Sequence, residues 1–338
     1  MKVMIAMSGG VDSAVSALFL KNQGWEVEGA TFLLSEGDAG FTAVEDAKKV
    51  ADFLGIPHHV FDFRELFAEK VVGDFLSEYE AGRTPNPCVR CNRFIKFPAF
   101  LAEAEKLGCE KIATGHYARI AEGRLFRAAA LEKDQSYVLY NLTQELLSRI
   151  IFPLGERTKT EIRQIAAEAG IPVAEKPDSQ DICFIPDGDT GGFLLRHGCG
   201  SEPGDFVAEN GSVLGRHKGV AHYTIGQRKG LGLSLPEPLY VGGIDPTNRQ
   251  VLLVRNEELF GRELLAGGFH WLSGHAPEQP IHVQCKIRYA HKPAEASFET
   301  LPDGTVRVAF LTPQRAITKG QSAVLYRGDE VLGGGIIL

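Results

Sequence analysis

The residues best suited to chemistry begin with a turn rich in glycine and serine near the start of the chain. Ser8-Gly9-Gly10-Val11-Asp12-Ser13 follows an apolar run and precedes a helical pattern. Two glycines permit a tight turn, and the following helix offers free N–H groups and the positive end of its dipole. Ser8 and Ser13 add hydroxyl donors, so the turn predicts a phosphate site at which Asp12 helps to hold Mg²⁺. A Gly-Gly turn capped by Ser and Asp is the alternative, which the flanking strand and helix disfavour.

The turn has no Gly-Lys-Ser/Thr ending of the Walker A type, and hence no lysine for a γ-phosphate. Its six residues instead resemble the PP-loop of the ATP pyrophosphatases, which cleave ATP between the α and β phosphates. Such an enzyme joins AMP to an oxygen that leaves poorly, and a second nucleophile then displaces the adenylate. The nucleophile must come from elsewhere in the chain.

The candidates for this nucleophile are cysteines. Cys88-Val89-Arg90-Cys91 lies in a proline-restrained stretch that we expect to be a loop, with Arg83, Arg93 and Lys96 around it. Neighbouring cations lower the pKa of a thiol, so this stretch favours thiolates. Cys183 lies in a second loop, 178–185. Half of a structural zinc site is the alternative, but no second Cys-x-x-Cys or pair of histidines completes it. Six cysteines form no disulfide framework, and core or surface positions are expected for Cys109, Cys199 and Cys285.

The elements that position these residues alternate between strand and helix over the first 115 residues. Strands are expected over Lys2–Met7, Glu26–Leu33, 59–61 and Lys111–Thr114, and a helix over Ser13–Asn22. Capping boxes at Thr42 and Thr158 each predict the start of a further helix. Alternation of this kind predicts a parallel sheet with helices on both faces. Ligands bind beyond the carboxyl ends of such strands, where Ser8–Ser13 and Gly115-His116 lie.

The texture changes after Pro186, where short β-type runs lie between Gly, Pro and Asn turns with little helical period. This pattern predicts one or two small β domains, at least one of them barrel-like. We expect an α/β catalytic domain over 1–190, a central β domain over 200–258 and a C-terminal β-barrel over 259–338. No stretch approaches the roughly 20 apolar residues that cross a bilayer. The apolar N-terminus is too short for a signal peptide, so a cytoplasmic protein is expected.

Taken alone, the net charge of −7 disfavours a nucleic acid partner. The charges are unevenly distributed, however. Residues 1–80 carry 6 basic and 14 acidic side chains, whereas residues 81–163 carry 14 basic and 9 acidic ones. Binding of a polyanion depends on local potential, so a basic middle segment is compatible with RNA. A chance excess is the alternative.

Along nearly its whole length the chain resembles the tRNA-specific 2-thiouridylases of the MnmA type. The resemblance rests on Ala6–Ser13, Gly82–Phe97, Ala113–Tyr117, Lys133–Tyr137, Asp178–Ile185, His222–Leu233 and Gly320–Val324. It implies a PP-loop domain of the adenine nucleotide α-hydrolase kind, followed by a small β domain and a β-barrel. It also implies ATP- and Mg²⁺-dependent 2-thiolation of the wobble uridine in tRNAs for Lys, Glu and Gln, with no membrane partner.

The resemblance assigns roles by position. Cys91 is the nucleophile and Cys183 carries the persulfide. ATP is bound by Ala6, Met7, Ser8, Gly9, Gly10, Val11, Asp12, Ser13, Phe32 and Gly115. The target base faces Asn86, Pro87 and Cys88, and further tRNA contacts are His116, Lys133, Asp134, Gln135, Arg288, Tyr289 and Gln321. We extend the tRNA contacts to Gln227, Arg228 and Lys229, for which a solvated basic loop is the alternative.

One departure from the family pattern leaves the sulfur chemistry open. The family often has Asp three residues before the nucleophile, where this chain has Cys88. In one route Cys183 carries a persulfide and Cys91 resolves it. In the other, Cys88, Cys91 and Cys183 hold a [4Fe-4S] cluster with one iron open to sulfide. The sulfur donor is a persulfide relay protein, a cysteine desulfurase or free sulfide.

Two other functions remain open at this point. A PP-loop ligase or amidotransferase that transfers nitrogen would need neither cysteine. An RNA-binding accessory protein that only senses nucleotide would release no pyrophosphate in response to tRNA.

Overall fold

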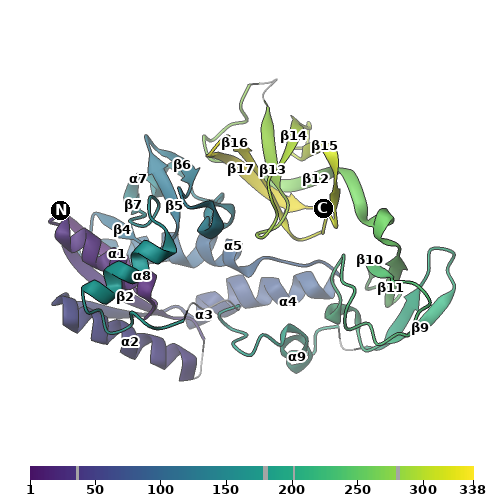
Figure 1. Ribbon diagram of the computed structural model, residues 1–338, viewed down its shortest axis with the longest axis horizontal. Coiled ribbons are helices and arrows are strands. Elements are labelled where there is room, and N and C mark those ends of the chain that lie inside the picture. The colour runs from purple at the N-terminus through teal and green to yellow at the C-terminus, as the bar shows by residue number, and fades with distance from the viewer. Residues whose placement is uncertain (36–37, 178–181, 201, 279–281) are drawn as a thin grey trace.

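A parallel sheet forms the N-terminal part of the protein. The computed structural model describes residues 1–35, 38–177, 182–200, 202–278 and 282–338. Within them, five strands pair in the order β3-β2-β1-β4-β7, and every pairing is parallel. Their bounds are Lys2–Ala6 (β1), Glu26–Leu33 (β2), His58–Asp62 (β3), Lys111–Ala113 (β4) and Ile150–Ile151 (β7). The predicted α/β class is confirmed (Figure 1).

Helices cover both faces of this sheet, because successive side chains of a strand point to opposite sides. Val3 and Ile5 pack with α1 (Val11–Asn22), α2 (Asp38–Leu54) and α8 (Lys159–Glu168). Met4 instead packs with Phe97 and with Phe100 at the start of α6 (Phe100–Lys106). The order of apolar residues along β1 therefore sets the two layers.

The two capping boxes had different outcomes. Thr158 caps α8 as predicted, and its hydroxyl accepts from the Glu161 N–H at 3.2 Å. The box at Thr42 was wrong, because α2 already begins at Asp38. A Thr-x-x-Glu pattern starts a helix only where the preceding chain is not helical, and here that chain is helical.

The Cys88–Cys91 stretch is helical, which corrects the prediction of a loop. Asn86 caps α5 (Pro87–Cys91) by accepting from the Cys88 N–H at 3.1 Å. Pro87 lies in the first turn, where its missing N–H costs nothing. The helix continues through a π-helical segment, Asn92–Ala99, into α6. Before α5 come α3 (Arg64–Phe67), a π-helical segment (Ala68–Val72) and α4 (Gly73–Glu80).

The middle of the chain forms a small sheet in the order β10-β11-β8-β9. Its strands are β8 (Gly204–Val207), β9 (Val213–His217), β10 (Tyr240–Asp245) and β11 (Gln250–Val254). Phe206, Val241 and Val251 belong to its own apolar core. A short helix, α9 (Thr190–Arg196), precedes the sheet, with Asp189 as its cap. Sequence patterns did not predict α9, since two of its seven residues are glycines.

The C-terminal strands form a β-barrel, as predicted, but they do not form its sheet alone. Eight described strands follow the order β12-β15-β14-β13-β16-β17-β6-β5, and β12 also pairs with β17 to close it. The hairpin β5–β6 (Ala118–Ala121, Arg124–Arg127) comes from the N-terminal part (Figure 1). The C-terminal strands are β12 (Phe260–Trp271), β13 (Val283–Lys286), β14 (Ala294–Thr300), β15 (Val306–Arg315), β16 (Ser322–Arg327) and β17 (Glu330–Ile337).

Buried contacts also join the barrel to the N-terminal part. The Tyr137 hydroxyl donates to the Ser322 carbonyl at 2.8 Å, and the Tyr140 hydroxyl lies 3.0 Å from the Ser322 hydroxyl. The remaining helical segments are α7 (Gln144–Arg149) and 3₁₀ turns at Leu131–Lys133, Ser136–Val138, Val220–His222 and Asn256–Leu259. Among the described residues, no helix is both long and apolar enough to cross a bilayer.

Candidate functional site

The Ser8–Ser13 turn lies between the carboxyl end of β1 and the start of α1. Gly9 has φ +69°, and a Cβ there would come within 2.8 Å of the Ala43 carbonyl oxygen, so the turn requires glycine. Gly115 presses on the same turn, since its Cβ would lie 3.0 Å from the Ser13 nitrogen. Gly10 precedes α1 without a side-chain cap. The helix N-terminus is therefore left for an anion.

Two hydroxyls shape the turn from inside. The Ser13 hydroxyl donates to the Gly10 carbonyl at 3.0 Å and accepts from the Ser8 N–H at 3.2 Å. The Ser8 hydroxyl lies 3.4 Å from that of Ser13. The hydroxyls and the open helix end thus lie together at the sheet edge, as the sequence predicts for a phosphate site.

Asp12 is held by two side chains that the sequence patterns did not identify. Lys159 Nζ lies 2.8 Å from each of its carboxylate oxygens, and the Tyr117 hydroxyl donates to Oδ1 at 2.7 Å. A second lysine, Lys176, donates to the Gly9 carbonyl at 3.1 Å. Lys159 follows the capping residue of α8, which packs against α1. No local sequence pattern links the two residues, because 147 positions separate Lys159 from Asp12.

The other predicted nucleotide contacts lie on β1 and β2. Ala6 ends β1, and the Met7 carbonyl accepts from the Thr31 hydroxyl at 2.8 Å. The Phe32 ring lies 4.9 Å from that of Phe100. Phe32 also packs against the apolar cluster that contains Cys91. It therefore connects the nucleotide side of the sheet edge to the cysteine side.

The fold brings the two cysteine segments together although 92 positions separate them. Cys91 is 4% exposed and belongs to an apolar cluster against which Phe184, next to Cys183, also packs. Cys88 and Cys183 are exposed, and all six cysteines, which lie within the described residues, are free thiols. The predicted stretch 178–181 lies outside the described residues.

The expectation of favoured thiolates is wrong. Burial raises the pKa of the Cys91 thiol to about 12, and the Lys96 ammonium offsets only part of this effect. Cys183 reaches solvent, yet the protein packed around it also raises the pKa of its thiol. Two of the three guanidiniums expected to help have carboxylate partners, Arg90 with Asp74 at 3.1 Å and Arg83 with Glu78. The thiols of Cys91 and Cys183 are therefore neutral in the resting site.

The barrel holds the chain just before α5. The Gln321 side-chain amide donates to the Thr84 carbonyl at 2.8 Å, and the Thr84 N–H donates to the Lys319 carbonyl at 2.9 Å. Tyr289 is 45% exposed, and Lys286 Nζ lies 5.5 Å from the centre of its ring. Arg288 donates to the Arg315 carbonyl at 3.0 Å. Asn86, Pro87 and Cys88 therefore lie where the barrel meets the first domain.

Of the other predicted tRNA contacts, several are built into the fold. Asp134 is 7% exposed and accepts from the N–H groups of Ala128 and Ser136 at 3.1 Å. Gln135 accepts from the Tyr117 N–H at 2.9 Å. His116 is buried beside Thr114, and burial lowers its pKa to about 3. His116 is thus uncharged at neutral pH. Lys133, next to Asp134 in the sequence, is half-buried.

The loop of the middle sheet presents free cations. Arg228 and Lys229 are exposed, and within the part of the chain that the structure describes neither has an ion-pair partner. Gln227 holds the loop, since its side chain accepts from the Thr224 N–H and donates to the Lys229 carbonyl, both at 3.0 Å. The adjacent Gly226 carbonyl accepts from Arg315 of the barrel at 3.4 Å.

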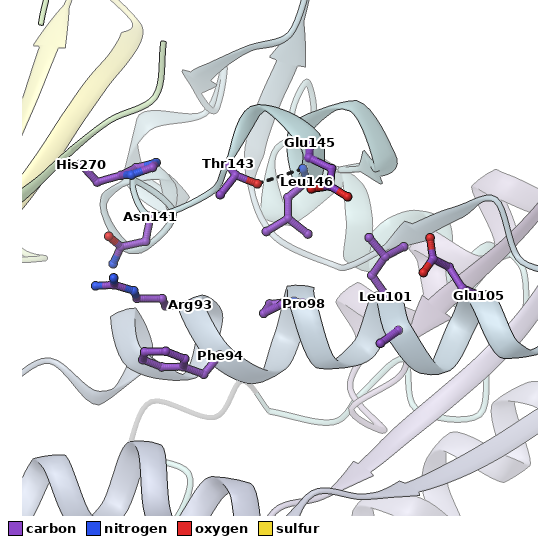
Figure 2. A pocket seen from close by; sticks show the side chains of 11 residues that line it. Arg93, Phe94, Pro98, Leu101, Glu105, Asn141, Thr143, Glu145, Leu146 and His270 are labelled. Carbon is purple, nitrogen blue, oxygen red and sulfur yellow. Dashed lines mark hydrogen bonds between the residues drawn. The ribbon is translucent and has the colours of Figure 1, made fainter. Parts of the chain in front are cut away.

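A cavity of about 450 Å³ lies between the π-helical segment Asn92–Ala99, α6 and α7. Figure 2 shows Arg93, Asn141 and His270 grouped at one end and Glu105 at the other, with Pro98 and Leu101 between them. None of the predicted site residues lines it. The predicted nucleotide and cysteine residues lie outside this cavity.

The described residues offer no ready-made metal centre. No group of three or more His, Cys, Asp or Glu side chains among them is arranged to hold a metal ion. Cys88, Cys91 and Cys183 are all described, and they do not form such a group. A nucleotide-bound Mg²⁺ makes a smaller demand, because it keeps several waters and takes one or two carboxylates plus phosphate oxygens. Asp12 fits that role.

Three family models match successive parts of the chain. A tRNA methyl transferase HUP domain matches residues 1–187, a tRNA methyl transferase PRC-barrel domain matches 192–255, and an aminomethyltransferase β-barrel domain matches 261–337. Solved structures are less similar. A 4-thiouridine synthetase–RNA complex with bound ATP shares 20% identity and a TM-score of 0.38 over 56% of this chain and 45% of that one. The U34-tRNA thiolase NcsA from Methanococcus maripaludis with its [4Fe-4S] cluster shares 18% and 0.39 over 58% and 67%.

Curated relatives match over the full length. The tRNA-specific 2-thiouridylase MnmA of Clostridioides difficile is 47% identical over 99% of this chain and 98% of its own. That of Carboxydothermus hydrogenoformans is 48% identical over 99% and 97%. The chain therefore belongs to the MnmA family of tRNA-specific 2-thiouridylases.

Proposed function

We propose that this protein uses ATP with Mg²⁺ to thiolate C2 of the wobble uridine in tRNAs for Lys, Glu and Gln. One observation carries the proposal. Cys91 lies in an apolar cluster against which Phe184, next to Cys183, and Phe32 of β2 both pack, and β2 pairs with β1, the strand that leads into the Ser8–Ser13 turn. A nitrogen-transferring ligase has no need for that arrangement.

The proposed reaction begins at the Ser8–Ser13 turn. The uracil O2 attacks the α-phosphate of ATP, pyrophosphate leaves, and C2 now carries AMP as a good leaving group. Asp12 holds Mg²⁺ there, and Ala6, Met7, Gly9, Gly10, Val11, Ser13, Phe32 and Gly115 complete the nucleotide site. Asn86, Pro87 and Cys88 face the target base, which leaves its stack to reach the site.

Sulfur transfer then follows from Cys183. The terminal sulfur of its persulfide attacks C2, and AMP departs. The Cys91 sulfur, once deprotonated, attacks Cys183 Sγ, so that a Cys91–Cys183 disulfide forms and the electron pair of the broken S–S bond stays on the base sulfur. A thiol reductant reopens the disulfide. No step needs an iron–sulfur cluster, and the three thiols do not form a group arranged to hold a metal ion.

The tRNA is proposed to cover three surfaces. Half-buried Lys133 and Gln135 belong to the first, with the buried Asp134 and His116 as supporting residues. Arg288, Tyr289 and Gln321 belong to the barrel, and Gln227, Arg228 and Lys229 to the middle sheet. The proposed domains are 1–190, 200–258 and 259–338. A persulfide relay protein or a cysteine desulfurase supplies sulfur as a persulfide; free sulfide loads Cys183 only by attacking its Sγ in the Cys91–Cys183 disulfide, with the Cys91 thiolate as leaving group. The reaction is proposed to take place in the cytoplasm.

The test compares Cys91→Ser and Cys183→Ser with Cys109→Ser, a buried cysteine far from this cluster in the fold. Unmodified tRNA, ATP and a persulfide donor are supplied, and 2-thiouridine and pyrophosphate are measured. We expect no 2-thiouridine from the first two variants and near-normal yield from the third. Thiolation by both cysteine variants would contradict the proposed route. Absence of tRNA-dependent pyrophosphate release in the unaltered protein would favour a nucleotide-sensing accessory role.

A further inference from the structure

A lysine from α8 lies at the phosphate-binding turn. Lys159 Nζ is 2.8 Å from both carboxylate oxygens of Asp12, and only 12% of its side chain is exposed. An ammonium so covered loses much of its hydration, and an isolated exposed pair would add little stability. The position of Lys159 at the turn therefore says more about ligand binding than about the stability of the fold.

Three features of the fold direct Lys159 to this place. Thr158 caps α8 through a complete capping box, which fixes where the helix begins. Ile162 and Ala166, one and two turns later, are fully buried in the core that also contains Val15 of α1. Lys159 therefore projects from one helix start toward the start of the other, where the phosphate-binding turn lies.

Binding a polyphosphate beside the Asp12 carboxylate requires a cation that can move to the phosphate oxygens. Asp12 carries the negative charge next to the open start of α1, and an incoming polyphosphate brings several more. Of the two lysines at the turn, Lys176 is bonded to the Gly9 carbonyl and to Asp46 at 2.8 Å. Lys159 is bonded to the very carboxylate that Mg²⁺ would take. A cation released from that carboxylate lies beside the phosphate oxygens.

We propose that Lys159 is the polyphosphate-binding lysine of this enzyme, held on Asp12 until nucleotide arrives and then transferred to the β- or γ-phosphate oxygens. This inference rests on the proposed nucleotide site and adds to it a residue that the turn itself lacks. Lys159 neutralises the charge that develops on the pyrophosphate as it leaves. Tyr117, which donates to the same carboxylate, keeps Asp12 in place when the lysine moves.

Binding without turnover tests this role. The dissociation constants of Mg²⁺ with α,β-methylene-ATP, and of AMP alone, are measured by calorimetry for the unaltered protein, Lys159→Met and Lys49→Met. Lys49 is a matched control, since it pairs with Asp46 beside the same turn and its side chain is 62% exposed. If Lys159→Met fails to fold, Lys159→Gln takes its place.

We expect Lys159→Met to weaken the analogue by roughly 10- to 100-fold, as for a lost charge-assisted hydrogen bond. AMP binding and the Lys49→Met variant should change by less than about threefold on the same scale. Unchanged affinity for the analogue would overturn the proposal, and so would an equal loss for AMP, which would make Lys159 structural. Failure of the unaltered protein to bind the analogue would instead overturn the proposed nucleotide site.

Discussion

The burial of Cys91 leads to a quantitative prediction about its reactivity. Only the thiolate is alkylated, and the pKa of this thiol is raised from 9.0 to about 12. At about pH 8 the thiolate fraction of an ordinary cysteine of pKa 9.0 is about one tenth, whereas that of Cys91 is about one in ten thousand. We therefore expect iodoacetamide to modify Cys91 about a thousandfold more slowly than a free cysteine in solution.

The pH dependence separates this cause from simple lack of access. Below its pKa a thiol gains about tenfold in thiolate for each pH unit. The Cys91 rate should therefore keep rising from about pH 8 to pH 10, whereas alkylation through transient opening would level off near the ordinary pKa. Pulse alkylation followed by peptide mass spectrometry measures the Cys91 rate, with Cys285, fully buried in the barrel, as a slow reference. A Cys91 rate equal to that of free cysteine at about pH 8 would refute the reasoning.

Four further outcomes are expected. Asp12→Asn should abolish tRNA-dependent pyrophosphate release, and its melting temperature should fall by only a few degrees, since the ion pair that it removes is partly exposed. Replacing Arg228 and Lys229 by Ala should lower the slope of log binding constant against log salt concentration for tRNA by about 1 for each phosphate that is no longer neutralised. An unchanged slope would show that these two side chains are solvated and do not contact tRNA. Anaerobic Cys88→Ser should keep activity without iron, whereas joint loss of iron and activity would favour a cluster. Since the His116 pKa is about 3, His116→Asn should leave the pH dependence of tRNA binding between about pH 5 and 8 unchanged.

Local patterns predicted the parts of the site that lie close together in sequence. The Ser8–Ser13 turn is recognisable because strand, glycines and helix follow one another directly. Thr158 was equally readable, since its box lies just before an apolar period. Cys88-x-x-Cys91 was misread because Pro87 is compatible with a stiff loop and with the first turn of a helix. Asn86, a strong capping residue, was the overlooked signal.

Residues far apart in sequence could not be placed in this way. The contact of Lys159 with Asp12 depends on how α8 packs against α1, which no local pattern encodes. The cations around Cys91 failed as predictors for a related reason. Composition shows that Arg83 and Arg90 are near, but only the fold shows that Glu78 and Asp74 neutralise them. The burial that raises the Cys91 pKa is likewise a tertiary property.

The hairpin β5–β6 helps to hold the barrel rigidly against the first domain, whereas the middle sheet does not share this attachment. Because it continues the barrel sheet, and because Tyr137 and Tyr140 reach into the barrel at Ser322, the barrel cannot tilt against the first domain without breaking buried hydrogen bonds. The middle sheet has a separate core and meets the barrel through polar contacts such as the 3.4 Å hydrogen bond from Arg315 to the Gly226 carbonyl. When a substrate as large as tRNA binds, we expect the middle sheet to move to fit its shape. The distance between the barrel and the cysteines should stay constant, so that it determines how the anticodon loop is positioned.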